Sequence, residues 1–426
     1  MSAPVGDLRD EVGTAAAPER RPRRPALVLP VAAFVTVTAE ALPVGLLRQM
    51  AEGLRTSPSQ VGLLVAWFAV VAGTTPVLLT RVTRRFDRRS VVLAMLVLFA
   101  AACAVTAAAP SFAVVFAARA VLAMSHALLF TVGMMVLVRL APPGRRGTAA
   151  GAMVVGASSA FVVGVPVATW CGQVLGWRAA HLLIGAVAVV LAAVVLAVVP
   201  RMPPDPAGSG GRDVGVTALL TTGPLLAVLA VTGVLVLSHF QLFTFLSPFL
   251  EDEVGVPTRS LGLVFAAFGV AGVLGSLVGG RLAEARPYAV ALGAVVVLLS
   301  SYLVLRLAAP NPVVAVLAVA VWGATFSVVA VSQQLAVLRL AGHGPSGETA
   351  VALNGAVFQG GIAAGSAVGS ALVGAGLLGA LPLASAAVAA LALSVVLTNA
   401  GAYTARPVLS QPAQRATGAA HQEESS

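Results

Sequence analysis

The sequence predicts an all-α membrane protein with twelve transmembrane helices in two pseudo-symmetric bundles of six. Composition is the first reason: of 426 residues, 58% are hydrophobic and only 10% are charged, so much apolar surface must face lipid. The second reason is the uncharged stretches, such as 91–109 and 182–200, which can cross roughly 30 Å of hydrocarbon as helices. The third is a repeat that relates the two halves of the chain. The alternating pattern of a membrane β-barrel is missing from these stretches.

Apolar windows separated by polar segments divide the chain into two tails, two bundles and a linker. We assign the N-terminal tail to 1–25, the bundles to 26–200 and 217–403, the linker to 201–216 and the C-terminal tail to 404–426. The linker is rich in Pro, Gly and Asp, which is typical of solvated segments, and we expect the last tail to be disordered. The predicted spans are 26–48, 59–81, 90–109, 112–138, 147–170, 179–200, 222–249, 259–281, 287–307, 312–339, 348–373 and 377–400.

The distribution of arginine predicts the orientation, because short cytoplasmic loops hold the positive charge of a membrane protein. With the N-terminus inside, 20 arginines fall in cytoplasmic segments and 5 in outer ones, while Arg119 lies within a span. An even number of spans returns the C-terminus to the same side. The arginine cluster at 20–24 leads into a full-length span without a small-residue cleavage site. We therefore expect a multi-pass inner-membrane protein with both termini in the cytoplasm.

Several other classes of protein are disfavoured. The net charge of +10 does not indicate nucleic-acid binding, because the arginines are scattered among hydrophobic spans. Cys103 and Cys171 fall within predicted spans, where a thiol usually acts as a small hydrophobe. The sequence lacks motifs for covalent chemistry, phosphate binding and zinc binding, so we expect no enzyme, no metal site and no cofactor. A membrane-embedded enzyme stays open as a remote alternative, and a channel is disfavoured because charged rings are missing.

The two halves of the chain repeat one another at an offset of 200 residues. This offset places the second predicted span on the eighth, at the same distance into each helix and its following loop. Under the offset, 61–63 falls on 261–263, Phe68 on Phe268 and Arg81 on Arg281. Such internal repeats are typical of secondary transporters.

The loop after the second predicted span reads Thr80-Arg81-Val82-Thr83-Arg84-Arg85-Phe86-Asp87-Arg88-Arg89, and its counterpart reads Gly280-Arg281-Leu282-Ala283-Glu284. Here the sequence resembles the major facilitator superfamily, and within it the twelve-span drug:proton antiporter branch of arabinose-efflux-like and chloramphenicol-efflux-like permeases. Thr80 and Arg84 replace the glycine and the acid of the family pattern. The resemblance implies a charged latch between the half-domains, whose acid in the first half would be Asp87. The alternative is that these arginines only set the topology. The candidate latch residues are Arg81, Asp87, Arg88, Arg89, Gly280, Arg281 and Glu284.

Three further stretches carry the resemblance. Arg119 within 116–122 looks like the buried arginine of the family's fourth span. The stretch 164–172 is similar to an antiporter motif of the fifth span, in which Gly164 and Pro166 would permit close helix approach and a local bend. The segments 238–246 and 353–361 are similar to patterns of the seventh and eleventh spans.

The resemblance implies that spans one, four, seven and ten line a central cavity. On the fourth span, His126 lies two helical turns from Arg119 and shares its face, and Phe130 continues that face. An apolar, aromatic cavity with a few polar groups suits an amphipathic small molecule. The alternative is that each histidine or amide only hydrogen-bonds a neighbouring helix. The candidate substrate-cavity residues are His126, Phe130, His239, Phe243, Gln334 and Asn354.

Glu40 is the only carboxylate well inside a predicted span, where a charge costs about 2.5–3.5 kcal/mol on insertion scales. Glu40 and Arg119 each lie about eight residues from the outer end of their spans, so at 1.5 Å per residue both are roughly 12 Å deep. Related antiporters carry an acid in span one and an arginine in span four, and the resemblance maps them onto these two residues. We predict that Glu40 is the proton-coupling acid and pairs with Arg119 in at least one state. The alternative is a static ion pair.

These features predict a secondary active transporter whose two bundles rock about a central site. Protonation of a cavity carboxylate would bias which side is open, as any ligand with differential affinity for two states must. We expect proton-coupled export of a small amphipathic or drug-like molecule by a monomer whose partners are its substrate, protons and the lipid bilayer. Sugar or nutrient transport is the alternative, although the spans are poor in the polar groups that hydroxyl-rich substrates need.

Overall fold

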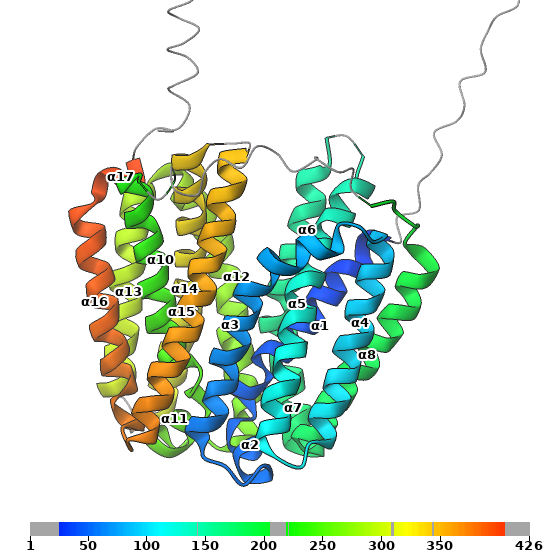
Figure 1. Cartoon of the computed structure of the whole chain (residues 1–426). Coiled ribbons are helices and arrows are strands. Elements are labelled where there is room, and N and C mark those ends of the chain that lie inside the picture. The colour runs from blue at the N-terminus through cyan, green and yellow to red at the C-terminus, as the bar shows by residue number, and fades with distance from the viewer. Residues whose placement is uncertain are drawn as a thin grey trace, which may run out of the picture.

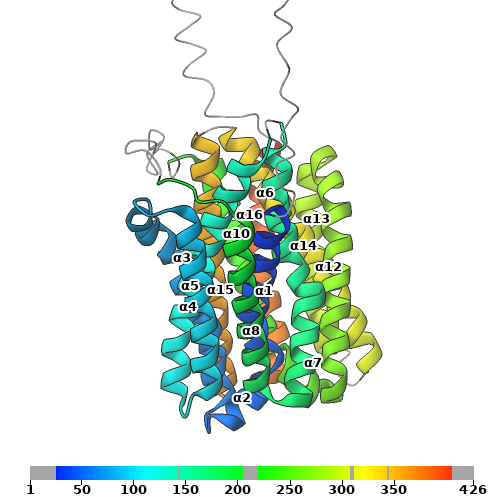
Figure 2. The ribbon, with the colours of Figure 1, turned by 90° about the vertical axis from the view of Figure 1, so that its right-hand side faces the viewer.

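The computed structural model describes residues 25–142, 144–204, 219, 221–307, 311–342 and 345–404. Within these residues, 12 helices are long and apolar enough to cross a membrane. They stand side by side in one bundle, as two perpendicular views show (Figures 1 and 2). The predicted all-α fold with twelve membrane helices is therefore confirmed. The predicted tails, apart from Pro25 and Thr404, and most of the predicted linker lie outside the described residues.

The twelve spans fall into two sets of six along the chain. The fifth span is interrupted: α6 (Arg146–Ser159) continues through a π-helical turn, η1 (Ala160–Gly164), into α7 (Val165–Leu175). The other spans of the first set are α1 (Pro25–Gly45), α3 (Pro58–Thr83), α4 (Arg88–Ala108), α5 (Phe112–Leu140) and α8 (Trp177–Val198). The second set consists of α10 (Gly223–Phe243), α12 (Leu261–Ala285), α13 (Pro287–Leu307), α14 (Pro312–Ala341), α15 (Pro345–Gly374) and α16 (Leu381–Thr398).

Short helical elements connect or extend the spans. In the first set, α2 (Leu47–Gly53) follows α1, and in the second set α11 (Leu246–Phe249) follows α10 and runs into a π-helical turn, η2 (Leu250–Val254). Two 3₁₀ turns, η3 (Thr258–Ser260) and η4 (Leu378–Ala380), precede α12 and α16, and α17 (Ala400–Thr404) follows α16.

The predicted first and seventh spans are too long by several residues, and both for the same reason. The sequence prediction continues them to 48 and 249, but α1 ends at Gly45 and α10 at Phe243. Leu46 and Phe245 leave the helical region with ψ angles of 22° and 19°, and α2 and α11 then start in new directions. The hydrophobic pattern runs through these breaks without interruption, so it could not mark them.

The two sets of six repeat the same neighbour relationships. Within the first set, α3 packs on α5, α1 on α6 and α4 on α8; within the second set, α12 packs on α14, α10 on α15 and α13 on α16. These are the second and fourth, first and fifth, and third and sixth spans of each set. The 200-residue offset also relates Arg139 to Arg339, in the last turns of α5 and α14. The repeat in the sequence thus corresponds to a repeat in the packing.

The two sets meet through equivalent helix pairs. On one side α3 packs against α15, and on the other α12 packs against α7 and η1. The second contact needs Gly269, because a Cβ there would lie 2.3 Å from the carbonyl oxygen of Phe161 in η1. Gly164, in the same turn, packs closely against α1, because a Cβ there would lie 2.0 Å from the Thr38 hydroxyl oxygen. Pro166 lies in the first turn of α7, which follows. Gly164 and Pro166 therefore lie at a close approach and a helix irregularity, as the sequence predicts.

One face of the bundle carries α17 and the start of α1, and we call it the terminal face; the opposite face carries α2 and α11 (Figure 1). At the opposite face the two sets are bonded to each other. The Ser247 hydroxyl in α11 donates to the Val44 carbonyl oxygen in α1 at 2.6 Å. Arg48 in α2 forms ion pairs with Glu251, at 3.4 Å, and with Asp252 in η2. The two sets are thus bonded to each other just beyond the ends of α1 and α10.

Candidate functional site

Arg119 is fully buried at the centre of the first set, and its hydrogen bonds follow from a proline. Pro43 has no N–H group, so it cannot donate to the carbonyl of Ala39 one turn earlier in α1. Instead, Nη1 of Arg119 donates a hydrogen bond to the Ala39 carbonyl oxygen at 2.8 Å, and Nη2 donates to the adjacent Glu40 carbonyl oxygen at 2.8 Å. Its guanidinium also lies over the Phe68 ring, 4.6 Å from the centroid. Arg119 therefore completes the backbone of α1 where proline interrupts it.

The Glu40 side chain turns to His126. Its Oε2 lies 3.7 Å from Nε2 of His126, and the two side chains are 18% and 11% exposed. Nδ1 of His126 lies 3.0 Å from the Thr36 hydroxyl, one helical turn before Glu40 on α1. The predicted contact between Glu40 and Arg119 is thus made through the backbone, and among the described residues the Glu40 carboxylate forms no ion pair with Arg119. Their pairing in another state stays a prediction.

Aromatic rings surround this acidic site on α3 and α5. The Phe68 ring lies between Arg119 and His126, with a centroid distance of 5.6 Å to the imidazole. Phe130 continues the face of His126 at 6.4 Å. Arg119, His126 and Phe130 therefore share one face of α5, as their spacing predicts.

His239 lies in an aromatic cluster in the second set. The Trp322 indole donates to Nδ1 of His239 at 2.9 Å, and the imidazole stacks on Phe326 with centroids 3.5 Å apart. The Phe243 ring also stacks on the imidazole, with centroids 4.9 Å apart. His239 and Phe243 are only 2% and 1% exposed, so in this structure they lie inside the cluster and not on an open cavity wall. The sequence could not show this, because Trp322 and Phe326 come from a distant helix.

Two of the predicted polar cavity residues contact each other. Nδ2 of Asn354 in α15 donates to Oε1 of Gln334 in α14 at 3.1 Å. Oδ1 of Asn354 is buried and has no hydrogen-bond partner among the described residues. Asn354 lines a cavity of about 20 Å³ together with Thr232, Phe326, Gln333 and Phe358. That volume holds roughly one water molecule.

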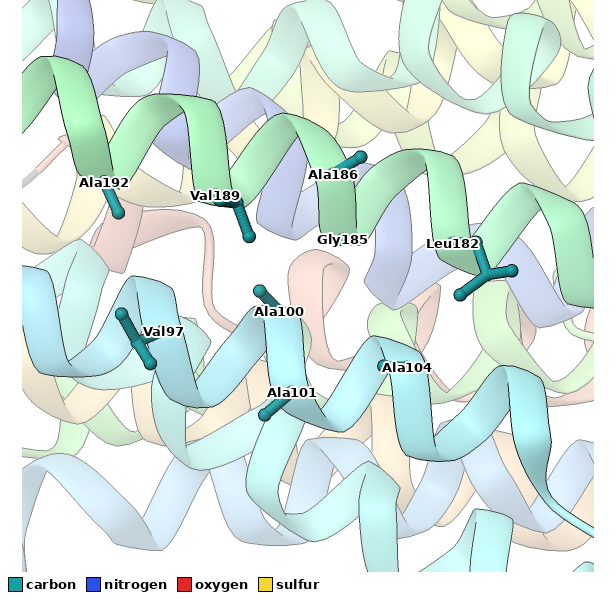
Figure 3. Close-up of a pocket in the computed structure, with 9 residues that line it drawn as sticks. All are labelled: Val97, Ala100, Ala101, Ala104, Leu182, Gly185, Ala186, Val189 and Ala192. Atoms are coloured by element: carbon teal, nitrogen blue, oxygen red, sulfur yellow. The ribbon is translucent and has the colours of Figure 1, made fainter.

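A larger hollow lies elsewhere, between α4 and α8 at the outer edge of the first set (Figure 3). It measures about 510 Å³, and Figure 3 shows apolar side chains of both helices around it, such as Val97, Ala104, Leu182 and Val189. No titratable or amide side chain lines it. In a membrane this face meets lipid tails, so we place the candidate site at Glu40 and His126, where polar groups converge.

Asp87 organises the loop after α3. It is the N-cap of α4 and accepts a hydrogen bond from the Ser90 N–H at 2.9 Å, while the Met202 N–H donates to its other oxygen at 2.6 Å. Partial burial raises the pKa of Asp87, but these hydrogen bonds and the charge of Arg201 outweigh burial and lower it. Both bonds stay within the first set and the segment that follows it. The predicted latch between half-domains is therefore not formed by Asp87 in this structure.

Two other residues of the first loop motif donate to carbonyls of the first set. Arg88 is buried and its Nη1 donates to the Thr83 carbonyl at 3.4 Å, and Arg89 donates to the Leu196 carbonyl. The side chain of Arg81 lies outside the described part of the chain. In the second set Arg281 and Glu284 are exposed, and a Cβ at Gly280 would be 3.7 Å from Val331.

Sequence reasoning missed several residues that complete these sites. Thr36 precedes Glu40 by four residues, so helical spacing could have placed it on the same face. Arg339 donates to the carbonyls of Ala283 and Glu284 at 2.6 and 3.1 Å and so caps α12, and the repeat with Arg139 could have drawn attention to it. The partners of Arg48 carried no such signal, because they are 203 and 204 residues away.

Twelve membrane helices in two repeated sets, with a partly exposed acid inside the first set, are typical of a multi-span transport protein. The family model of the Major Facilitator Superfamily matches residues 29–366, so the chain belongs to that superfamily. The match covers more than half of the sequence.

Solved structures share the fold at low sequence identity. A bacterial homologue of the human lysosomal transporter Spinster, in an inward-facing, unoccupied conformation, has a TM-score of 0.71 at 15% identity, covering 90% of this chain and 96% of that one. A variant of the nucleoside transporter NupG has a TM-score of 0.70 at 13% identity, covering 88% and 99%. The human organic anion transporter MFSD10 (TETRAN) has a TM-score of 0.61 at 19% identity, covering 88% and 99%.

Proposed function

We propose that the protein is a proton-coupled exporter of a small amphipathic molecule, located in the inner membrane. The observation that carries the proposal is the Glu40 side chain, which is partly exposed at membrane depth, 3.7 Å from His126 and within electrostatic reach of the buried Arg119. Among the described residues of the spans, it is the one carboxylate away from a helix end. An ionised carboxylate at membrane depth costs free energy, and a role in binding a proton explains why a carboxylate is present there.

Coupling follows from a change of charge at the centre of the first set. When Glu40 is ionised, its negative charge balances the positive charge of the Arg119 guanidinium. When Glu40 is protonated, the positive charge of Arg119 is left without a balancing charge. These two charge states stabilise different arrangements of the surrounding helices and different substrates. Protonation can therefore bias the alternation of the two halves, as a ligand with differential affinity does.

The surroundings favour an amphipathic substrate. Phe68 and Phe130 flank the acidic site, and the second set presents Phe326 and Phe358 beside the amides of Gln333 and Asn354. Aromatic walls with few polar groups suit a molecule with one apolar and one polar part. The alternative is a polar nutrient such as a nucleoside, which is favoured by the unpartnered Oδ1 of Asn354 and by the fold that the chain shares with NupG.

Inverted membrane vesicles test the proposal. A fluorescent lipophilic cation, a neutral amphiphile and a nucleoside are offered with and without an imposed proton gradient. We expect gradient-driven accumulation of an amphipathic compound, which Glu40→Gln abolishes while substrate exchange without a gradient remains. Glu348→Gln, an exposed acid in the first turn of α15, is the matched control and keeps full activity. Full gradient-driven transport by Glu40→Gln would overturn the coupling role, and accumulation of the nucleoside alone would contradict an amphipathic substrate.

A further inference from the structure

The Thr36 hydroxyl connects the backbone of α1 to Nδ1 of His126. The Thr36 hydroxyl has one hydrogen and donates it to the Ala33 carbonyl oxygen at 3.2 Å. The same hydroxyl lies 3.0 Å from Nδ1 of His126, and with its hydrogen directed at Ala33 it accepts from Nδ1. We take the tautomer that this arrangement gives, in which Nδ1 carries the hydrogen and Nε2 of the neutral imidazole keeps its lone pair.

That lone pair faces the Glu40 carboxyl group. Nε2 and Oε2 are 3.7 Å apart, which is within ionic reach but longer than a hydrogen bond by roughly 0.5–1 Å. Two atoms that can only accept, held face to face away from bulk water, repel each other. One proton removes the repulsion, either as a carboxylic acid directed at Nε2 or as an imidazolium beside a carboxylate.

Among the described residues, His126 is the one basic side chain within 4 Å of the Glu40 carboxyl group. The two Nη groups of Arg119 donate to the backbone carbonyls of Ala39 and Glu40. Cys103 on α4 and His181 on α8 lie within electrostatic reach of Arg119, and Nδ1 of His181 is bonded to its own helix at the Trp177 carbonyl. We therefore take the proton between Glu40 and His126 to be exchanged with water or with the substrate.

We propose that Glu40 and His126 hold the transported proton jointly and that Thr36 is the positioning residue that keeps Nε2 directed at the carboxyl group. The inference rests on the proposed proton coupling and adds the second proton-binding group. On proton uptake an O–H bond forms at Glu40 or an N–H bond at Nε2 of His126; on release that bond breaks and the proton returns to water. A helix movement that separates the two side chains weakens the binding of the proton and so links movement to release.

Two spectroscopic probes test the inference without a substrate. The purified protein in lipid nanodiscs is titrated with pH while infrared difference spectra report the carboxyl bands of Glu40, assigned with Glu40→Gln. Nitrogen-15 magnetic resonance reports the imidazole of His126, assigned with His126→Gln among the 5 histidines. Joint binding predicts one common midpoint for both probes. It also predicts that His126→Gln and Thr36→Val each move the Glu40 midpoint by about 1 pH unit, a tenfold change in proton affinity.

The controls separate this inference from the proposed function. Thr36→Ser keeps a hydroxyl and should restore the wild-type midpoint, and His181→Gln, which removes a histidine that does not contact Glu40, should leave it unchanged. A Glu40 midpoint that is insensitive to His126→Gln and Thr36→Val overturns joint binding but leaves Glu40 as a coupling acid. Spectra of the wild type and of Glu40→Gln that show the same pH dependence overturn the coupling itself.

Discussion

At the scale of single residues, Arg119 shows how one side chain can serve structure and charge together. Its two Nη groups satisfy carbonyls of α1, one of which is free because of Pro43, while its charge lies beside the Glu40 carboxyl group. A polar backbone group without a partner costs several kcal/mol in a lipid-like interior. The arginine therefore fixes the shape of α1 at the residue that we propose binds the proton.

A substitution cycle tests this structural role. Arg119→Leu should lower the thermal midpoint of unfolding, because the Ala39 carbonyl loses its partner, at a cost of about 1–3 kcal/mol. Pro43→Ala restores a backbone N–H that can bond to Ala39, so Arg119→Leu should cost clearly less in that background. Pro30→Ala, a proline of the same helix that does not contact Arg119, is the control. Equal losses in all three backgrounds would contradict the role of the proline.

Sequence reasoning reached the candidate site in part. It found Glu40, Arg119, His126 and Phe130 because charged and aromatic residues are rare in spans and because helical spacing shows which residues share a face. It did not find that the Glu40 carboxyl group faces His126 in this structure, since equal depth in the membrane does not distinguish a side chain from a backbone carbonyl. It could not show that His239 is enclosed by Trp322 and Phe326, because that contact depends on how α10 and α14 pack.

At the scale of elements, hydrophobic runs predicted the number and order of the spans, and local chemistry set their ends. Asp87 begins α4 and Asn311 begins α14, where its side chain accepts from the N–H groups of Val313 and Val314. The breaks after Gly45 and Phe243 and the π-helical turn η1 were not predictable from periodicity, because apolar residues continue through all three. They depend on proline and on close contacts with other helices.

The cap of α4 makes stability depend on pH. Because hydrogen bonds and Arg201 lower the pKa of Asp87 in the folded protein, its contribution is present above the ordinary value of 3.8 and is lost as the pH falls through the lowered value. Asp87→Asn should therefore lower the thermal midpoint of unfolding at pH 7 and flatten its pH dependence below about pH 4. Glu284→Gln, an exposed acid at the end of α12, should keep the wild-type pH dependence. Parallel curves for the wild type and Asp87→Asn would contradict this cap.

At the scale of the whole molecule, the arginine distribution predicts that the terminal face lies in the cytoplasm. Cysteines introduced at Ser2 and Ser209 should stay unlabelled by an impermeant thiol reagent in intact cells. Cysteine at Ser57, an exposed residue between α2 and α3 on the opposite face, should be labelled. A Cys171→Ser background removes the partly exposed native thiol, and Cys103 is buried. Labelling at Ser2 or Ser209 from outside would contradict the orientation.

The bonds at the opposite face differ in how far water and salt can reach them. The Ser247–Val44 hydrogen bond is buried, whereas the Arg48 and Asp252 side chains are 44% and 45% exposed. Dissolved ions screen exposed charges and hardly affect a buried hydrogen bond between neutral groups. The ionic strength of the compartment at this face therefore affects the ion pairs of Arg48 and hardly affects the Ser247–Val44 hydrogen bond. Salt there should weaken the ion pairs of Arg48 while leaving the Ser247–Val44 hydrogen bond in place as the contact that sets the relative position of the two halves.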